Sequence, residues 1–114
     1  MTATEFLNAT YIGHRHIVRP RVTCADGFSI SIQGGTSTHY CSPRETCNVY
    51  HEVELAFPSE IVPDLLWFAE MYGQPTDSIY GYVPIELVEE VISNHGGICG
   101  YTQGHKEHSK ESKK

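Results

Sequence analysis

The chain has 114 residues, 39% hydrophobic and 19% charged, with a formal net charge of −6 at pH 7. This length predicts one domain with one core. The composition excludes a disordered chain, and no apolar run approaches the roughly 18 residues that a membrane helix needs. The first residues also lack the basic-then-apolar order of a signal peptide. We therefore expect a cytoplasmic protein whose four cysteines are thiols.

The charge is distributed unevenly along the chain. Residues 1–102 hold 4 basic and 12 acidic side chains, a formal charge of −8, whereas residues 103–114 hold four lysines and two glutamates. An acidic body disfavours duplex nucleic acid, whose binding depends on neutralised phosphates. Its only cations are arginines, which suit a forked grip on an anion as well as surface pairs with glutamates. We predict a single α+β domain over 1–102 and a disordered charged tail over 103–114.

The N-terminal half favours strands. Residues 2–10 fit either a short helix or a strand, and residues 11–24 alternate, although Pro20 cannot donate a ladder hydrogen bond. Asp26-Gly27 is a tight-turn signal, and residues 28–33 alternate apolar and polar side chains. These signals predict a hairpin over about 17–33, followed by a loop over 34–48 with a brief strand at 39–41.

The next segment, 49–57, alternates again and predicts a strand that ends at Pro58. Its apolar face would carry Val49, His51, Val53, Leu55 and Phe57.

Helical signals dominate the C-terminal half. Apolar spacing predicts one helix over about 63–72, with Gly73 just beyond its end. A strand over 78–83 leads to a second helix that Pro84 opens and Gly96-Gly97 ends, and 98–101 predicts a last strand. The order indicates a mainly antiparallel sheet with two helices packed on one face. Because such a small sheet leaves edges and one face to cover, we expect a homo-oligomer, a dimer or higher.

Two thiols and two imidazoles gather in the middle of the chain. They are ligand types for tetrahedral zinc, but the knuckle spacing of structural zinc sites is absent, so buried thiols and a core histidine are the preferred interpretation. A cysteine nucleophile with a histidine base is a further alternative, without an evident oxyanion hole. We predict no enzyme and no cofactor. The weak metal candidates are His39, Cys41, Cys47 and His51.

A third group combines forked cations, hydroxyl groups and aromatic rings. These suit the phosphates, the ribose and the base of a nucleotide. The alternative is that the tyrosines pack at the rim of the sheet and the arginines pair with glutamates. The predicted ligand-binding residues are Arg19, Arg21, Tyr40, Ser42, Arg44 and Tyr82.

Three stretches carry a resemblance to a known family: VTCADGFSISIQ (22–33) with HYCSPR (39–44), VYHEVELAFPSE (49–60) and SIYGYVPIELVEEVISNHGG (78–97). Over about residues 10–98 they resemble small phage and prophage proteins, most of all the phage anti-Thoeris sponge proteins. The resemblance implies an oligomeric anti-defence protein, acting in the cytoplasm of an infected bacterium. It would bind and sequester an immune signal, a cyclic ADP-ribose isomer or a cyclic oligonucleotide, without converting it. The match is a dispersed pattern, so no binding residue of the family is carried over.

Two alternatives remain beside this expectation. One is an acidic interaction protein that blocks a host defence complex directly, in the manner of an anti-CRISPR protein, because basic channels attract surfaces of this charge. The other is a zinc- or cysteine-dependent enzyme.

Overall fold

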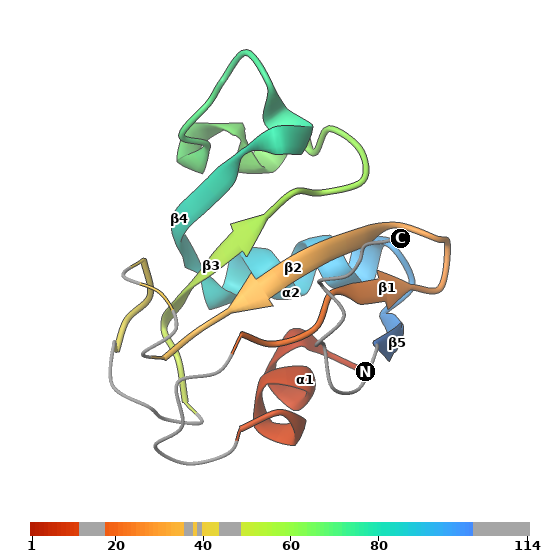
Figure 1. The fold of residues 1–114 in the computed structure, drawn as a ribbon. Coiled ribbons are helices and arrows are strands. Elements are labelled where there is room, and N and C mark those ends of the chain that lie inside the picture. The colour runs from red at the N-terminus through yellow and green to blue at the C-terminus, as the bar shows by residue number, and fades with distance from the viewer. Residues whose placement is uncertain (12–17, 36–37, 39, 44–48, 102–114) are drawn as a thin grey trace.

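The computed structural model describes residues 1–11, 18–35, 38, 40–43 and 49–101. Its strands form one five-stranded antiparallel sheet in the order β4-β3-β2-β1-β5. The predicted α+β class with a mainly antiparallel sheet is therefore confirmed. Along the chain the elements are α1 (Ala3–Ala9), β1 (Val22–Cys24), β2 (Ser29–Gln33), β3 (Glu52–Ala56), the 3₁₀-helices η1 (Pro63–Phe68) and η2 (Pro75–Asp77), β4 (Ile79–Pro84), α2 (Ile85–Asn94) and β5 (Ile98–Tyr101) (Figure 1).

One hydrophobic core joins both α-helices to the sheet. Phe6 and Leu7 of α1 and Ile92 of α2 are buried together with Ile30 of β2 and Tyr80 of β4. Full burial of one such side chain stabilises the fold by about 1.5–3 kcal/mol. The 3₁₀-helices lie at the opposite end of the molecule from α1, where β3 ends and β4 begins (Figure 1).

The predicted hairpin is present, with Val22 opposite Ile30 across β1 and β2. Its turn follows from the chemistry of Asp26-Gly27: Asp26 Oδ1 accepts from the backbone N–H of Phe28 at 3.0 Å, and Gly27 takes a φ of 96°. The paired strands begin at Val22, later than expected, and residues 12–17 lie outside the described part of the chain.

The strand predicted over 49–57 is shorter than the alternation suggested. Val53 and Leu55 are buried in β3 as predicted, but the strand covers only Glu52–Ala56. Beyond those bounds the period of two no longer holds, so Val49 and Phe57 are exposed. The expectation of a core histidine is wrong, because His51 lies exposed just before the strand.

The helix predicted over about 63–72 is a 3₁₀-helix that ends at Phe68. Ala69 turns to an extended conformation, with ψ of 137°, and forms a β-bridge to Tyr80. Glu70 then donates its backbone N–H to the carbonyl of Ile79 at 3.0 Å. Pairing with β4 therefore replaces the continuing helix.

Besides α2, the fold contains the α-helix α1, which forms in a segment whose sequence fits either a short helix or a strand. It begins with a capping box in which Thr2 Oγ1 accepts from Glu5 N at 3.0 Å and Thr2 N donates to Glu5 Oε1 at 2.8 Å. Helix α2 matches its prediction, and the left-handed Gly96 and Gly97, with φ of 91° and 85°, end it. A Cβ on Gly96 would lie only 2.8 Å from the Cβ of Ala25.

Strands β4 and β5 match the strands predicted over 78–83 and 98–101. The brief strand expected at 39–41 falls partly outside the described residues, and the tail over 103–114 falls wholly outside them. Within the described ranges, no helix is long and apolar enough to cross a membrane.

Candidate functional site

Arg19, a predicted ligand-binding residue, is only 6% exposed and has a structural role. Its guanidinium donates to Thr10 Oγ1 at 2.6 Å, to the carbonyl of Gly34 at 2.8 Å and to the carbonyl of Leu7 at 3.2 Å. It also lies 5.8 Å from the centroid of the Tyr50 ring. Leu7 belongs to the last turn of α1, where backbone carbonyls lack the amide donors of a following helical turn. Arg19 therefore fastens the C-terminal end of α1 to the chain that follows β2.

The side-chain amide of Gln33 holds the backbone of Arg19. Gln33 Oε1 accepts from the backbone N–H of Arg19, and Gln33 Nε2 donates to its carbonyl, both at 2.8 Å. Gln33 is itself buried at the end of β2 and also donates to Ser31 Oγ at 2.9 Å. These bonds leave Arg19 engaged on both its backbone and its side chain.

Arg21 lies in a different environment, on the surface beside β2. Its Nε donates to Ser29 Oγ at 3.0 Å, and its Nη2 donates to the carbonyls of Ser29 at 3.2 Å and Phe57 at 2.6 Å. Partial burial lowers the pKa of Arg21. The side chain thus ties β2 to the end of β3, and its partners include none of the residues that Arg19 contacts.

Tyr40 and Tyr82 do come together. Their ring centroids are 6.0 Å apart with an interplanar angle of 88°, an edge-to-face pair, and the backbone N–H of Tyr82 donates to the carbonyl of Tyr40 at 2.9 Å. Tyr40 packs over Gly81, where a Cβ would lie 3.4 Å from the aromatic ring. Residues from a loop and from β4 therefore share one aromatic surface.

A bulge in the sheet sets the backbone conformation of Tyr82. Between the pairs Val53–Val83 and Leu55–Tyr80 the register shifts, so that Glu54 faces two residues of β4, Gly81 and Tyr82. Tyr82 takes a left-handed conformation with φ of 54°, which is uncommon for a residue with a bulky side chain. Tyr82 is 46% exposed, so the bulge places an aromatic residue at the surface.

Two carboxylates adjoin the aromatic pair. The negative charge of Glu70 is the largest cause of a raised pKa of Tyr40, and a hydrogen bond between these side chains acts in the same direction. Burial is the largest cause of a raised pKa of Glu54; the charge of Glu70 adds to it, while a hydrogen bond from Thr38 opposes it. We call Tyr40, Glu54, Glu70 and Tyr82 the acid–aromatic site.

Ser42 and the metal candidates lie near this site in the chain. Ser42 forms a backbone bridge with Glu52, at 2.9 and 3.1 Å, and its carbonyl also accepts from His51 N at 2.8 Å. Cys41 is a buried thiol whose Sγ lies 3.1 Å from the backbone nitrogen of Gly35, which donates to it. No group of three or more His, Cys, Asp or Glu is arranged to hold a metal within the described ranges. His39 and Cys47 fall outside those ranges.

The predicted ligand-binding set is therefore divided. Tyr40 and Tyr82 are brought together, Arg19 and Arg21 have separate structural contacts, and Arg44 falls outside the described residues. Sequence reasoning missed the two carboxylates. Glu54 alternates with the apolar positions of the segment 49–57, a pattern that by itself indicates a side chain in solvent, and no local signal indicates that Glu70 meets a loop tyrosine.

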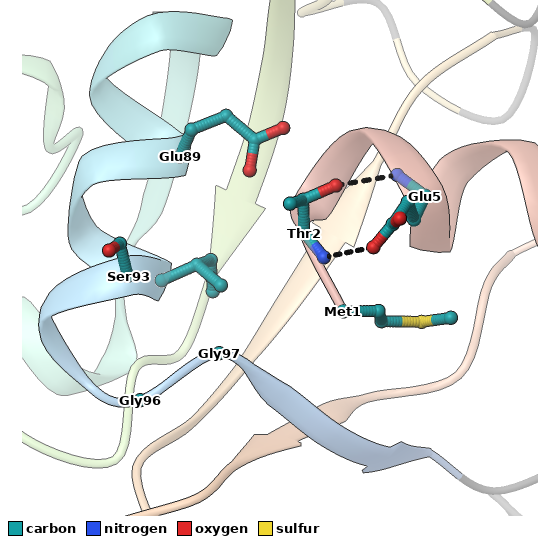
Figure 2. A pocket seen from close by; sticks show the side chains of 8 residues that line it. Met1, Thr2, Glu5, Glu89, Ser93, Gly96 and Gly97 are labelled. Carbon is teal, nitrogen blue, oxygen red and sulfur yellow. Dashed lines mark hydrogen bonds between the residues drawn. The ribbon is translucent and has the colours of Figure 1, made fainter.

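A pocket of about 400 Å³ lies elsewhere, between α1, α2 and the start of β5 (Figure 2). Three of its polar side chains have partners within the fold, and one of them joins the two helices. Thr2 and Glu5 form the capping box, and the carboxylate of Glu89 accepts from the backbone N–H groups of Ala3 at 2.8 Å and Thr4 at 2.9 Å. The pocket is thus a helix junction, and the acid–aromatic site is the stronger candidate for function.

The acid–aromatic site has groups suited to a nucleoside. An exposed aromatic face stacks a base, and a carboxylate accepts hydrogen bonds from ribose hydroxyls. The same carboxylates repel a phosphate placed directly beside them. No protein-family model matches the chain, and neither a curated protein nor a solved structure matches it.

Proposed function

We propose that this chain is a non-enzymatic binding protein that sequesters a nucleotide-derived signal, and that the acid–aromatic site holds the nucleoside end of the ligand. The observation that carries the proposal is the edge-to-face pair of Tyr40 and Tyr82 beside two carboxylates. A left-handed conformation at a bulky residue costs of order 1–3 kcal/mol, and such strain concentrates at functional sites. The bulge at Tyr82 is strain of this kind.

Each part of a nucleoside has a counterpart in the site. A base stacked on a tyrosine ring contributes roughly 1–3 kcal/mol. Glu54 has lost part of its water, so a ribose hydroxyl that donates to it offsets the cost of burying the charge. Phosphates point away from Glu54 and Glu70 and require a cation. Since Arg19 and Arg21 are engaged with backbone carbonyls, Arg44 is the remaining predicted candidate.

The resemblance to anti-Thoeris sponge proteins favours a cyclic ADP-ribose isomer or a cyclic oligonucleotide as the ligand. In this proposal the chain acts as a homo-oligomer in the cytoplasm of an infected bacterium, where it lowers the concentration of the immune signal. A protein with this task has to bind tightly and release the ligand unchanged.

The test is a thermal-shift screen against cyclic ADP-ribose isomers and cyclic di- and trinucleotides. Ligand at about 100 times its Kd should stabilise the protein by about 2.7 kcal/mol. The nucleotide should be recovered intact after denaturation, and Tyr40→Ala should abolish the shift. Tyr72→Ala, which removes an exposed tyrosine outside the site, should retain it. A flat screen rejects the proposal, and conversion of the nucleotide overturns its non-enzymatic part.

A further inference from the structure

A second surface of the molecule lies around η1, at the far end of β3 and β4 (Figure 1). We call residues 57–77 the η1 lobe. Large apolar side chains of the lobe are exposed to solvent. A largely exposed tryptophan among them is typical of interaction sites. Its exposed fractions are 82% for Trp67, 63% for Tyr72, 55% for Ile61 and 47% each for Phe57 and Met71.

The lobe is built into the fold rather than loosely attached. Leu65 of η1 is fully buried in the core. Ser78 joins two of the apolar residues, since its carbonyl accepts from Phe57 N and its Oγ accepts from Met71 N, each at 3.0 Å. The Tyr72 hydroxyl donates to the carbonyl of Trp67 at 3.4 Å. The backbone of the lobe therefore presents its apolar side chains from fixed positions.

The surroundings of these side chains are acidic. Glu60, Asp64, Glu70 and Asp77 are all exposed within the lobe. Residues 49–101 contain nine acidic side chains and neither lysine nor arginine. Within the described part of the chain, the single contact that can form an ion pair joins Asp26 to His95, when the imidazole is protonated, and lies outside the lobe. An apolar surface with unneutralised carboxylates around it calls for a partner that supplies both apolar and cationic groups.

We propose that the η1 lobe docks a basic amphipathic helix of another protein. An apolar stripe would cover Trp67 and the flexible Met71, and flanking lysines or arginines would meet Glu60 and Asp64. A second copy of the chain is a poorer occupant, because its lobe brings the same negative charge. The described arginines of that copy, Arg19 and Arg21, both donate hydrogen bonds within the fold.

Trp67 is the only tryptophan in the chain, so its fluorescence reports directly on the lobe. The probes are two synthetic amphipathic helices of equal length and apolar pattern, one built from leucine and lysine and the other from leucine and glutamate. We expect the lysine peptide to shift the emission to shorter wavelength in a saturable way, and added salt to weaken this binding. The glutamate peptide should leave the emission unchanged.

A charge variant completes the test. Glu60→Gln with Asp64→Asn should weaken binding of the lysine peptide about fivefold, since each exposed ion pair contributes modestly. Glu86→Gln with Glu90→Gln, an equal change on exposed positions of α2, should leave it unchanged. Glu70 is kept in both variants, and neither peptide is a nucleotide, so failure here is independent of the acid–aromatic site.

Three results would overturn the inference. The first is an equal response, or no response, to both peptides, which rejects a charge-selective surface. The second is undiminished binding by the Glu60 and Asp64 variant. The third is a shift of the emission with protein concentration alone, which would assign the lobe to a second copy of this chain.

Discussion

Tyr82 meets Tyr40 edge to face at 6.0 Å while its own backbone takes a left-handed φ of 54°. The two observations have one cause, the bulge that sets Gly81 and Tyr82 opposite Glu54. The sheet thus departs from regular pairing at the point where it presents an aromatic surface. This relationship motivates the first prediction.

Tyr82→Gly should preserve the fold and weaken ligand binding. Glycine adopts a positive φ without steric cost. The relief of this strain offsets part of the stability that is lost with the contacts of the ring. Loss of stacking should weaken nucleotide binding by roughly 1–3 kcal/mol, measured by isothermal titration calorimetry. Phe57→Gly is the matched control, because Phe57 is also left-handed, with φ of 53°, and lies outside the site. Equal affinity in the two variants would exclude Tyr82 from the site.

Glu54→Gln should raise stability at neutral pH. Burial and the charge of Glu70 raise the pKa of Glu54, so the folded state binds this proton more tightly than the unfolded state does. Stability of the natural chain should therefore decline as the pH rises from the unfolded value, about 4.3, through the raised folded value. Urea titrations between about pH 4 and pH 8 should show a flatter profile for the variant. An unchanged profile would contradict the assigned cause.

Nucleotide binding provides a second readout of the same variant. In the proposed site the ionised Glu54 accepts a ribose hydroxyl, so Glu54→Gln should weaken binding although it stabilises the fold. Glu52→Gln, on the same strand, is the control. A gain in both stability and affinity would place the ribose elsewhere.

Arg19→Ala should destabilise the protein and leave the affinity of the folded fraction unchanged. The substitution removes two hydrogen bonds from the guanidinium to the carbonyls of Leu7 and Gly34, and a hydrogen bond to a charged group contributes about 1.5–3 kcal/mol. Lysine should not restore the stability, since an ammonium cannot reproduce the guanidinium fork. Arg21→Ala, at an exposed position, should cost less. Urea denaturation measures all three variants, and a larger loss for Arg21→Ala would contradict the assignment.

Asp26 should contribute an acid-sensitive part of the stability. Its pKa is lowered first by the hydrogen bond from Phe28 N and then by the hydrogen bond to His95, whose Nδ1 lies 2.7 Å from Oδ2. A lowered pKa gives stability that is present above the unfolded value, about 3.9, and is lost as the pH falls through the folded value. Asp26→Asn should flatten this acid limb in urea titrations at pH 2–6. A limb as steep as that of the natural chain would show that other carboxylates cause it.

Local signals in the sequence determined the turn at Asp26-Gly27, strands β4 and β5 and the end of α2 at Gly96-Gly97. Turn chemistry and side-chain periodicity act over a few residues, so these features can be derived without the rest of the chain. The same signals predicted a strand over 49–57, which is longer than the observed β3. They also predicted an α-helix where pairing of Ala69 with Tyr80 produces a shorter 3₁₀-helix.

The tertiary structure alone decided what the polar side chains do. Arginine, tyrosine and glutamate have no fixed role until distant segments supply their partners. Folding brings Arg19 to the carbonyls of Leu7 and Gly34, which makes it structural, and it brings Glu70 to Tyr40, which creates the acid–aromatic site. The sequence by itself therefore determined the turn at Asp26-Gly27, strands β4 and β5, helix α2 and the acidic composition of the chain. Its candidate site depended on contacts between residues far apart in the chain, which no local pattern encodes.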